Sequence, residues 1–133
     1  MKNKILIFGK GFIGSRLREA LGCPLSEKRI QSFEDVQQEI HRHRPKILVN
    51  CIGHTGKRNV DGCELDKDKT LFANTYVPVL LAEAAFRHKI KLVHLSSGCI
   101  YHFDYALDKP ITEERDPDFL DLYYSRSKIY AEK

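Results

Sequence analysis

The sequence predicts an α/β fold built on a doubly wound parallel sheet, and two observations support this prediction. Short apolar runs typical of buried strands alternate along the chain with longer stretches of helical periodicity. A glycine-rich stretch at residues 9–14 follows the first apolar run and opens the first helical stretch. Such alternation implies parallel strands joined by right-handed helical crossovers.

The first part of the chain predicts three strands and two helices. Ser32 and Asp35 are typical of a capped helix start, and a basic stretch before Pro45 is typical of a helix end. In order, we expect a strand at 4–8, a helix at 12–21, a short strand at 23–26, a helix at 32–44 and a strand at 47–50.

The second part predicts one more strand between long polar and helical segments. Pro78 lies inside the longest helical pattern and is expected to kink or split it. In order, we expect a polar loop at 53–62, a helical stretch at 66–88, a strand at 92–95, a polar loop at 104–120 and a helix at 122–133.

Length and composition indicate one ordinary globular domain over residues 1–133, with 42% apolar and 30% charged residues. The net charge is only +4 and the cations are scattered along the sequence, so no nucleic-acid partner is expected. The apolar runs are too short for a signal peptide or a membrane span, which favours a cytoplasmic protein without a membrane partner.

The four cysteines form no C-x-x-C pair and are expected to be reduced. Cys51, His54 and Cys63 have the residue types of a metal site, but a second close ligand pair is missing. We therefore expect no metal, and interpret Cys51 and Cys63 as small buried apolar residues.

The glycine-rich stretch fits G-x-G-x-x-G, the pattern of a Rossmann-type dinucleotide site. The first glycine permits a tight turn, the second lets a pyrophosphate approach the backbone, and the third lets the helix pack closely. The alternative is a tight strand–helix turn without a ligand. The predicted contacts here are Gly9, Lys10, Gly11, Phe12, Ile13 and Gly14.

The residues after the second strand favour NADP(H) over NAD(H). An acid that binds the NAD ribose is expected about 20 residues after the glycines. Glu34 and Asp35 lie near that distance but fall in the next predicted helix. The segment 26–29 offers a serine and two cations that suit a 2′-phosphate, with Arg29 as the candidate contact, although a solvated turn would have the same composition.

Tyr124 and Lys128 form a Y-x-x-x-K pair that a helix places on one face. An ammonium group in such a pair can lower the pKa of a phenol, which can then exchange a proton with a carbonyl oxygen. Taken alone, the pair is also common on helix surfaces.

The glycine turn, the serines after the fourth strand and the Y-x-x-x-K pair together resemble the extended short-chain dehydrogenase/reductases. The resemblance implies that Ser97 is the catalytic serine, Tyr124 the acid/base and Lys128 the residue that binds the nicotinamide ribose. Residues 45–55 resemble the third strand and following loop of dTDP-4-dehydrorhamnose reductases. That loop implies further cofactor contacts at Cys51, Ile52, Gly53 and Thr55.

Residues 55–64 and 98–104 resemble the plant-type UDP-4-keto-6-deoxyglucose 3,5-epimerase/4-reductases. GDP-fucose synthases also carry a cysteine two residues after the catalytic serine, as Cys99 follows Ser97 here. In an extended chain both side chains would point the same way. We therefore hypothesise that Cys99 moves a proton at C3 or C5 of a keto-sugar; the alternative is a buried thiol in a turn.

The resemblance implies NADP(H)-dependent reduction of a 4-keto-6-deoxy nucleotide sugar, with 3,5-epimerisation. The alternatives are a 4-reductase or 4-epimerase without 3,5-epimerisation, and a non-catalytic nucleotide-binding regulatory subunit.

Two features of the sequence depart from the pattern of these relatives. The first two glycines are one residue closer than in these relatives, and the sequence stops at Lys133 inside the Y-x-x-x-K helix. We expect the C-terminal substrate domain to be absent, and exposed sheet edges to favour a partner chain such as a homodimer.

Overall fold

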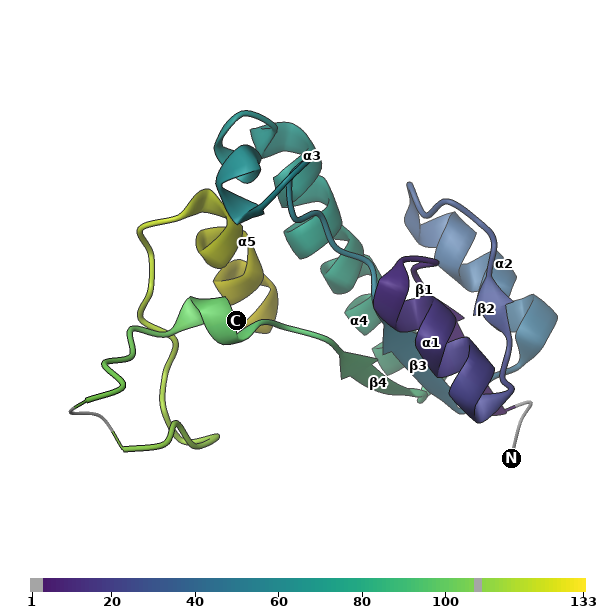
Figure 1. Ribbon diagram of the computed structural model, residues 1–133. Coiled ribbons are helices and arrows are strands. Elements are labelled where there is room, and N and C mark those ends of the chain that lie inside the picture. The colour runs from purple at the N-terminus through teal and green to yellow at the C-terminus, as the bar shows by residue number, and fades with distance from the viewer. Residues whose placement is uncertain (1–3, 107–108) are drawn as a thin grey trace.

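Four parallel strands form the centre of a computed structural model that describes residues 4–106 and 109–133 (Figure 1). In spatial order the strands are β2 (Leu25–Ser26), β1 (Ile5–Phe8), β3 (Ile47–Asn50) and β4 (Lys91–His94). Their last residues are register partners: Phe8 pairs with Ser26 and Asn50, and Asn50 pairs with His94. The carboxyl ends of all four strands therefore meet at one edge of the sheet, which we call the carboxyl edge.

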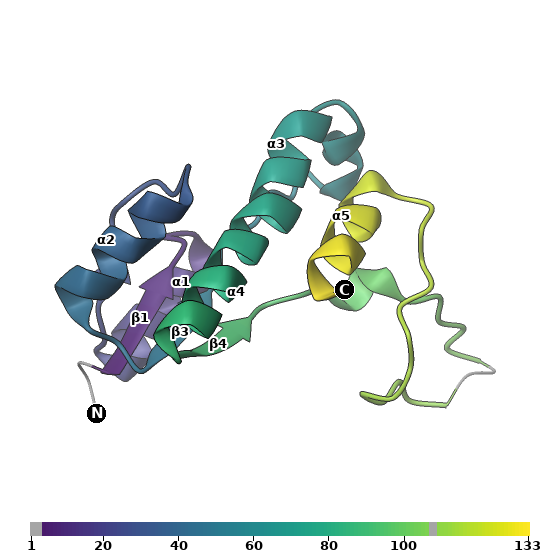
Figure 2. The same cartoon turned by 180° about the vertical axis from the view of Figure 1, so that it is seen from behind.

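Helices cover both faces of the sheet, which confirms the doubly wound prediction. The α-helices of the described chain are α1 (Phe12–Leu21), α2 (Phe33–His43), α3 (Lys67–Leu71), α4 (Val77–His88) and α5 (Tyr123–Glu132). Of these, α1, α2 and α4 cover the sheet. α1 packs on one face, where its Leu17 joins a cluster with Ile7 and Val49. α2 and α4 pack on the opposite face, as the two views of the ribbon show (Figures 1 and 2).

The larger core lies between the sheet and the pair α2 and α4. Leu6, Phe8 and Leu48 project from the strands into it and are fully buried. They meet Val36 of α2 and Leu81 of α4. Because side chains alternate between the two faces of a strand and both faces are covered, the strand sequences are apolar throughout.

The start of α2 has the predicted cap. The Ser32 side chain accepts a hydrogen bond from the Asp35 backbone, and the Asp35 carboxylate accepts one from the Ser32 backbone. This reciprocal pair satisfies two N–H groups that the first helical turn leaves free. The observed strands differ slightly from the predictions, since β2 spans only two residues and β4 begins one residue earlier than expected.

The long helical stretch before β4 contains a π turn, Phe72–Tyr76, between α3 and α4. Pro78 follows it in the first turn of α4 and has no N–H to donate to the preceding turn. The Val77 N–H bonds to the Phe72 carbonyl, five residues back. The expected kink or split at Pro78 thus takes the form of a local π turn just before the proline.

α5 lies beside α3 and the π turn rather than on the sheet (Figures 1 and 2). Two 3₁₀ turns, Val60–Glu64 and Gly98–Ile100, also pack against it. Among the described residues, no helix combines the length and apolarity needed to cross a bilayer.

Replacing Leu81 by alanine should lower the free energy of unfolding by about 2–5 kcal/mol, because it leaves a cavity in the larger core. Urea denaturation would measure this as a lower midpoint with an unchanged slope. Val79→Ala is the matched control, since Val79 lies on the same helix with half of its surface exposed, and should change stability by less than about 0.5 kcal/mol. Equal effects of the two changes would contradict the assigned core face of α4.

Candidate active site

The glycine turn after β1 has two positions that only glycine fits. Gly9 has a φ of +98°, and a Cβ there would lie 2.6 Å from the carbonyl carbon of Cys51. A Cβ on Gly14 would overlap the carbonyl oxygen of Gly9, so α1 packs directly against the turn. Gly11 faces open space, which leaves its backbone accessible to a ligand.

The start of α1 has the features of an anion-binding helix end. Gly11 is its N-cap, no side chain caps the helix, and its first turn holds no acidic residue. The first backbone N–H groups therefore lack a side-chain acceptor, and the helix dipole favours negative charge nearby. A pyrophosphate would satisfy both requirements.

A pocket of about 740 Å³ opens beside this turn and spans the ends of β1, β2 and β3. The strand order reverses between β1 and β3, which is where doubly wound sheets bind ligands. Of the predicted cofactor contacts, Gly9, Lys10, Arg29, Ile52 and Gly53 line the pocket. Seven others do not, namely Gly11, Phe12, Ile13, Gly14, Cys51, Thr55 and Lys128. His54, Lys69 and Phe72 also line it, although no local pattern marks them as cofactor contacts.

The cations after β2 have different surroundings. Lys28 is engaged with α2: its Nζ donates to Gln38 at 2.6 Å and forms an ion pair with Asp35 at 3.1 Å. Hydrogen bonds from the Gln31 backbone and from Lys28 lower the pKa of Asp35. Arg29 lines the pocket and has no ion-pair partner among the described residues. It is therefore the free cation of this segment.

Glu27 directly follows β2 and lines the same pocket. Its carboxylate lies 3.7 Å from the ammonium of Lys10, with both side chains exposed. Glu34 and Asp35, the acids that sequence spacing indicates, lie in α2 instead. Glu27 is thus the acid that borders the pocket at the end of β2, and the spacing argument did not select it.

Tyr124 and Lys128 are both buried on α5. The Lys128 ammonium donates a hydrogen bond to the carbonyl oxygen of Leu95, just after β4, at 3.3 Å. It also faces the backbone of Gly53, just after β3. Burial lowers the pKa of Lys128, and the Glu132 carboxylate partly offsets this shift. The ammonium is therefore held at the carboxyl edge of the sheet.

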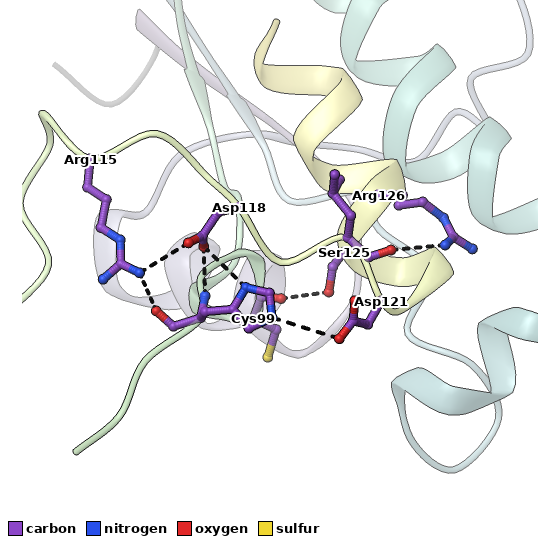
Figure 3. A network of polar contacts seen from close by, with 8 residues as sticks. Cys99, Arg115, Asp118, Asp121, Ser125 and Arg126 are labelled. Carbon is purple, nitrogen blue, oxygen red and sulfur yellow. Dashed lines mark hydrogen bonds and ion pairs between the residues drawn. The ribbon is translucent and has the colours of Figure 1, made fainter. Parts of the chain in front are cut away.

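Ser97 and Cys99 lie on the 3₁₀ turn after β4. The Ser97 hydroxyl accepts a hydrogen bond from the Cys99 backbone at 3.1 Å. Ser125, the residue after Tyr124, donates to the Cys99 carbonyl at 2.6 Å and so ties this turn to α5 (Figure 3). The Cys99 side chain is exposed, which contradicts the buried-thiol alternative. The turn also replaces the extended chain that the alternation argument assumed.

The fully buried side chain of Asn74, in the π turn, joins the loop after β3 to α5. Its Oδ1 accepts from the His54 N–H at 2.7 Å. Its Nδ2 donates to the His54 carbonyl and to the Ser127 hydroxyl, each at 3.0 Å. The Ser127 hydroxyl in turn donates to the Tyr124 carbonyl at 2.6 Å. π turns frequently occur at functional sites, and this one aims an amide between two predicted site segments.

One further contact holds the start of α5, and others lie within the segment that precedes it. The Glu64 carboxylate accepts a hydrogen bond from the Tyr123 N–H at 2.7 Å, which caps the helix from a distant loop. Asp118 accepts from the His102 backbone at 2.8 Å and pairs with Arg115 at 3.3 Å (Figure 3). These contacts, His102 first, lower the pKa of Asp118. The Glu64 contact therefore holds the first turn of α5, and the Asp118 contacts join two parts of the segment before it.

Cys51 and Cys63, which have the residue type of metal ligands, have surroundings that differ from those of a metal site. Cys63 is buried and its thiol donates to the His54 carbonyl at 3.6 Å. Cys51 is only half-buried, which corrects the expectation of a buried residue, and burial raises the pKa of its thiol. Within the described residues, no three potential metal ligands come together.

His94, at the end of β4, is a half-buried histidine near Lys128. The Asn50 carboxamide oxygen accepts from the Ile52 N–H at 3.0 Å, so its NH₂ group donates to His94 Nδ1, also at 3.0 Å. The His94 proton therefore resides on Nε2, which is buried without a partner among the described residues. Burial, and then the charge of Lys128, lower the pKa of His94.

The fold and the glycine turn define a Rossmann-type α/β domain with a tyrosine–lysine helix beside it. The chain belongs to the family described as the RmlD substrate binding domain, whose model matches residues 3–133. This membership confirms the resemblance to dTDP-4-dehydrorhamnose reductases.

Three similar proteins extend this result. The Arabidopsis thaliana trifunctional UDP-glucose 4,6-dehydratase/UDP-4-keto-6-deoxy-D-glucose 3,5-epimerase/UDP-4-keto-L-rhamnose-reductase RHM1 is 30% identical, over 98% of this chain and 21% of that protein. The bifunctional dTDP-4-dehydrorhamnose 3,5-epimerase/dTDP-4-dehydrorhamnose reductase from the same plant is 32% identical. That match covers 96% of this chain and 46% of the plant protein. The crystal structure of the L780 UDP-rhamnose synthase from Acanthamoeba polyphaga mimivirus is similar, with a TM-score of 0.84 and 29% sequence identity. The match covers 96% of this chain and 49% of that chain. The chain thus spans less than half the length of each.

His94 should make the protein less stable as the pH falls below about 6.5. The folded pKa is lower than the ordinary value of 6.5, so the unfolded chain takes up a proton that the native state does not. The contribution of His94 is complete above about pH 6.5 and is lost as the pH falls toward the folded pKa. His94→Gln should therefore flatten the fall in urea midpoint below about pH 6.5. His102→Gln, at an exposed position, is the control, and an unchanged slope in His94→Gln would refute the assignment.

Proposed function

We propose that residues 1–133 form the NAD(P)-binding and catalytic part of a nucleotide-sugar reductase. The proposed reaction is NADP(H)-dependent reduction of a 4-keto-6-deoxy nucleotide sugar, combined with 3,5-epimerisation. The names of the two plant relatives support this substrate class, since both include a reductase and a 3,5-epimerase of such sugars. The observation that carries the proposal is the position of Lys128, between Leu95 and Gly53 at the edge that also holds the glycine turn.

The residues present fit a dinucleotide. Gly9 and Gly14 leave room for no side chain, the start of α1 offers free N–H groups, and the adjacent pocket has the volume of a small-ligand site. A nicotinamide cofactor bound there would supply the hydride for C4 of the sugar. Lys128 would hold the ribose next to the nicotinamide, and Arg29 would bind a 2′-phosphate.

Tyr124 and Ser97 are assigned to the C4 carbonyl group. Tyr124 gives a proton to the carbonyl oxygen, and the positive charge of Lys128 stabilises the phenolate that remains. The Ser97 oxygen already accepts from the Cys99 backbone, so its own proton is free to bond the sugar oxygen.

Cys99 is assigned to the epimerisation. The C4 carbonyl acidifies the protons on the neighbouring C3 and C5 carbons, and an exposed thiol beside the catalytic serine can exchange one of them. The Ser125 hydrogen bond fixes the Cys99 backbone relative to Tyr124, its neighbour on α5. One polar contact would therefore coordinate the groups used for epimerisation and for reduction.

Arg29→Gln should weaken NADPH binding about tenfold or more and leave NADH binding nearly unchanged, because a hydrogen bond between charged groups contributes about 1.5–3 kcal/mol. Nicotinamide fluorescence titrations would measure both affinities. Glu27→Gln is the matched comparison in the same pocket and should affect NADH more than NADPH, since a carboxylate binds ribose hydroxyls and repels a 2′-phosphate. Equal losses for both cofactors in Arg29→Gln would rule out the NADP(H) assignment. Absence of saturable binding to the folded wild-type chain would refute the cofactor site itself.

Cys99→Ser should abolish the exchange of solvent deuterium into C3 or C5 of a UDP-4-keto-6-deoxy sugar and spare reduction of an already epimerised substrate. The assay uses the full polypeptide that carries residues 1–133, with NMR of the sugar as the readout. Tyr124→Phe is the complementary variant and should slow reduction by about 10²–10⁴. Unchanged exchange in Cys99→Ser would exclude the proposed role of Cys99. Unchanged reduction in Tyr124→Phe would favour the regulatory alternative.

A further inference from the structure

Two basic segments that are distant in the sequence meet at the amino edge of the sheet, where the strands begin. α2 and α4 cover the same face and both end at this edge, opposite the candidate active site (Figure 2). Residues 41–46 lead from α2 into β3, and residues 87–91 lead from α4 into β4. The Lys91 N–H donates to the Lys46 carbonyl at 3.1 Å, so the two segments lie side by side.

A groove of about 440 Å³ lies between these segments, and we call it the basic groove. Apolar side chains of Ile40, Pro45 and Ile90 line it. His41 and His88 also line it, with their rings edge to face and 5.5 Å between ring centroids. Arg44 and Lys46 complete the lining. The groove therefore combines cations with flat and apolar surfaces.

The charge of this edge is not balanced by nearby acids. Segments 39–46 and 83–91 contain six lysines and arginines but only two carboxylates, Glu39 and Glu83. Both carboxylates already have partners, His43 at 3.6 Å and Arg87 at 2.6 Å. The excess of four cations equals the net charge of +4 of the whole chain. Within the described residues, the side chains of Arg44 and Lys46 have no hydrogen-bond or ion-pair partner.

Two of these cations occupy unusual backbone positions. Arg44 and Lys89 are the C-caps of α2 and α4, with φ of 48° and 54°, and are the only positive-φ residues other than glycine in the described chain. Glycine or asparagine normally occupies such a cap, because other side chains are strained there. The carboxyl end of a helix favours a cation nearby, but the cation can lie at any position of the last turn. The helix dipole therefore does not explain why the cations occupy the strained cap positions.

We propose that the basic groove binds the phosphate groups of a small soluble nucleotide, at a site separate from the cofactor pocket. Arginine and lysine side chains pair with phosphate oxygens, and the histidine rings with Pro45 and Ile90 offer a surface for a base. The volume is that of a small-molecule site. The site goes beyond the proposed function because it lies at the opposite edge of the sheet.

Ring signals of the six histidines in ¹H–¹³C NMR spectra of the whole chain test this proposal. His41 and His88 report on the basic groove, whereas His54 reports on the cofactor pocket. His41→Gln and His88→Gln assign the signals. Titration with ADP, and separately with inorganic pyrophosphate, in physiological salt should shift the His41 and His88 signals in a saturable way.

The double variant Arg44→Asn with Lys46→Gln should weaken this binding at least about tenfold, because it removes two charged hydrogen-bond donors. Asparagine tolerates the left-handed backbone of the cap, so the fold is preserved. Lys89→Asn is the control matched to the cap change: it removes one positive charge from the equivalent cap of α4, outside the groove, and should change the affinity by about twofold at most. Circular dichroism verifies that each variant is folded.

Three outcomes would overturn the proposal: shifts that do not saturate, saturation of the His54 signal alone, or equal losses in the double variant and in Lys89→Asn. If an oligothymidylate saturates the His41 and His88 signals and ADP does not, the groove belongs to a nucleic-acid surface instead. Neither result affects the cofactor titrations, so failure here is distinguishable from failure of the proposed function.

Discussion

The hydrogen bonds of the buried Asn74 amide are the interaction on which the candidate site depends. α5 carries Tyr124 and Lys128 but does not pack on the sheet, so strand pairing cannot position it. Asn74 bonds to both backbone groups of His54 and to Ser127 of α5, and thereby places the helix against the loop after β3. A buried amide without partners is costly, so this geometry is strongly favoured over alternatives.

Three other contacts of α5 are polar as well. Glu64 caps its first turn, Ser125 binds the Cys99 carbonyl, and Lys128 binds the Leu95 carbonyl. Apolar packing tolerates sliding, whereas hydrogen bonds have narrow distance and angle requirements. A helix held by such bonds presents its tyrosine and lysine at a defined position relative to the strand ends, which proton transfer requires.

The two edges of the sheet have different chemistry. At the carboxyl edge, a glycine turn and an uncapped helix start favour anions through backbone groups. At the amino edge, side chains supply the positive charge, and the excess over local acids equals that of the entire chain. The two kinds of chemistry lie at opposite edges because of the topology: α2 and α4 begin at the carboxyl edge and end at the amino edge.

The sequence by itself determined the strands, most helix boundaries and the glycine turn, because apolar periodicity, the Ser32–Asp35 cap and the fit of Gly9 depend mainly on local geometry. Only the tertiary structure decided which residues surround the candidate site. Asn74 and Ser127 are 53 residues apart, and the basic segments appear scattered until α2 and α4 bring them to one edge. Such contacts follow from the path of the whole chain, which no local pattern encodes.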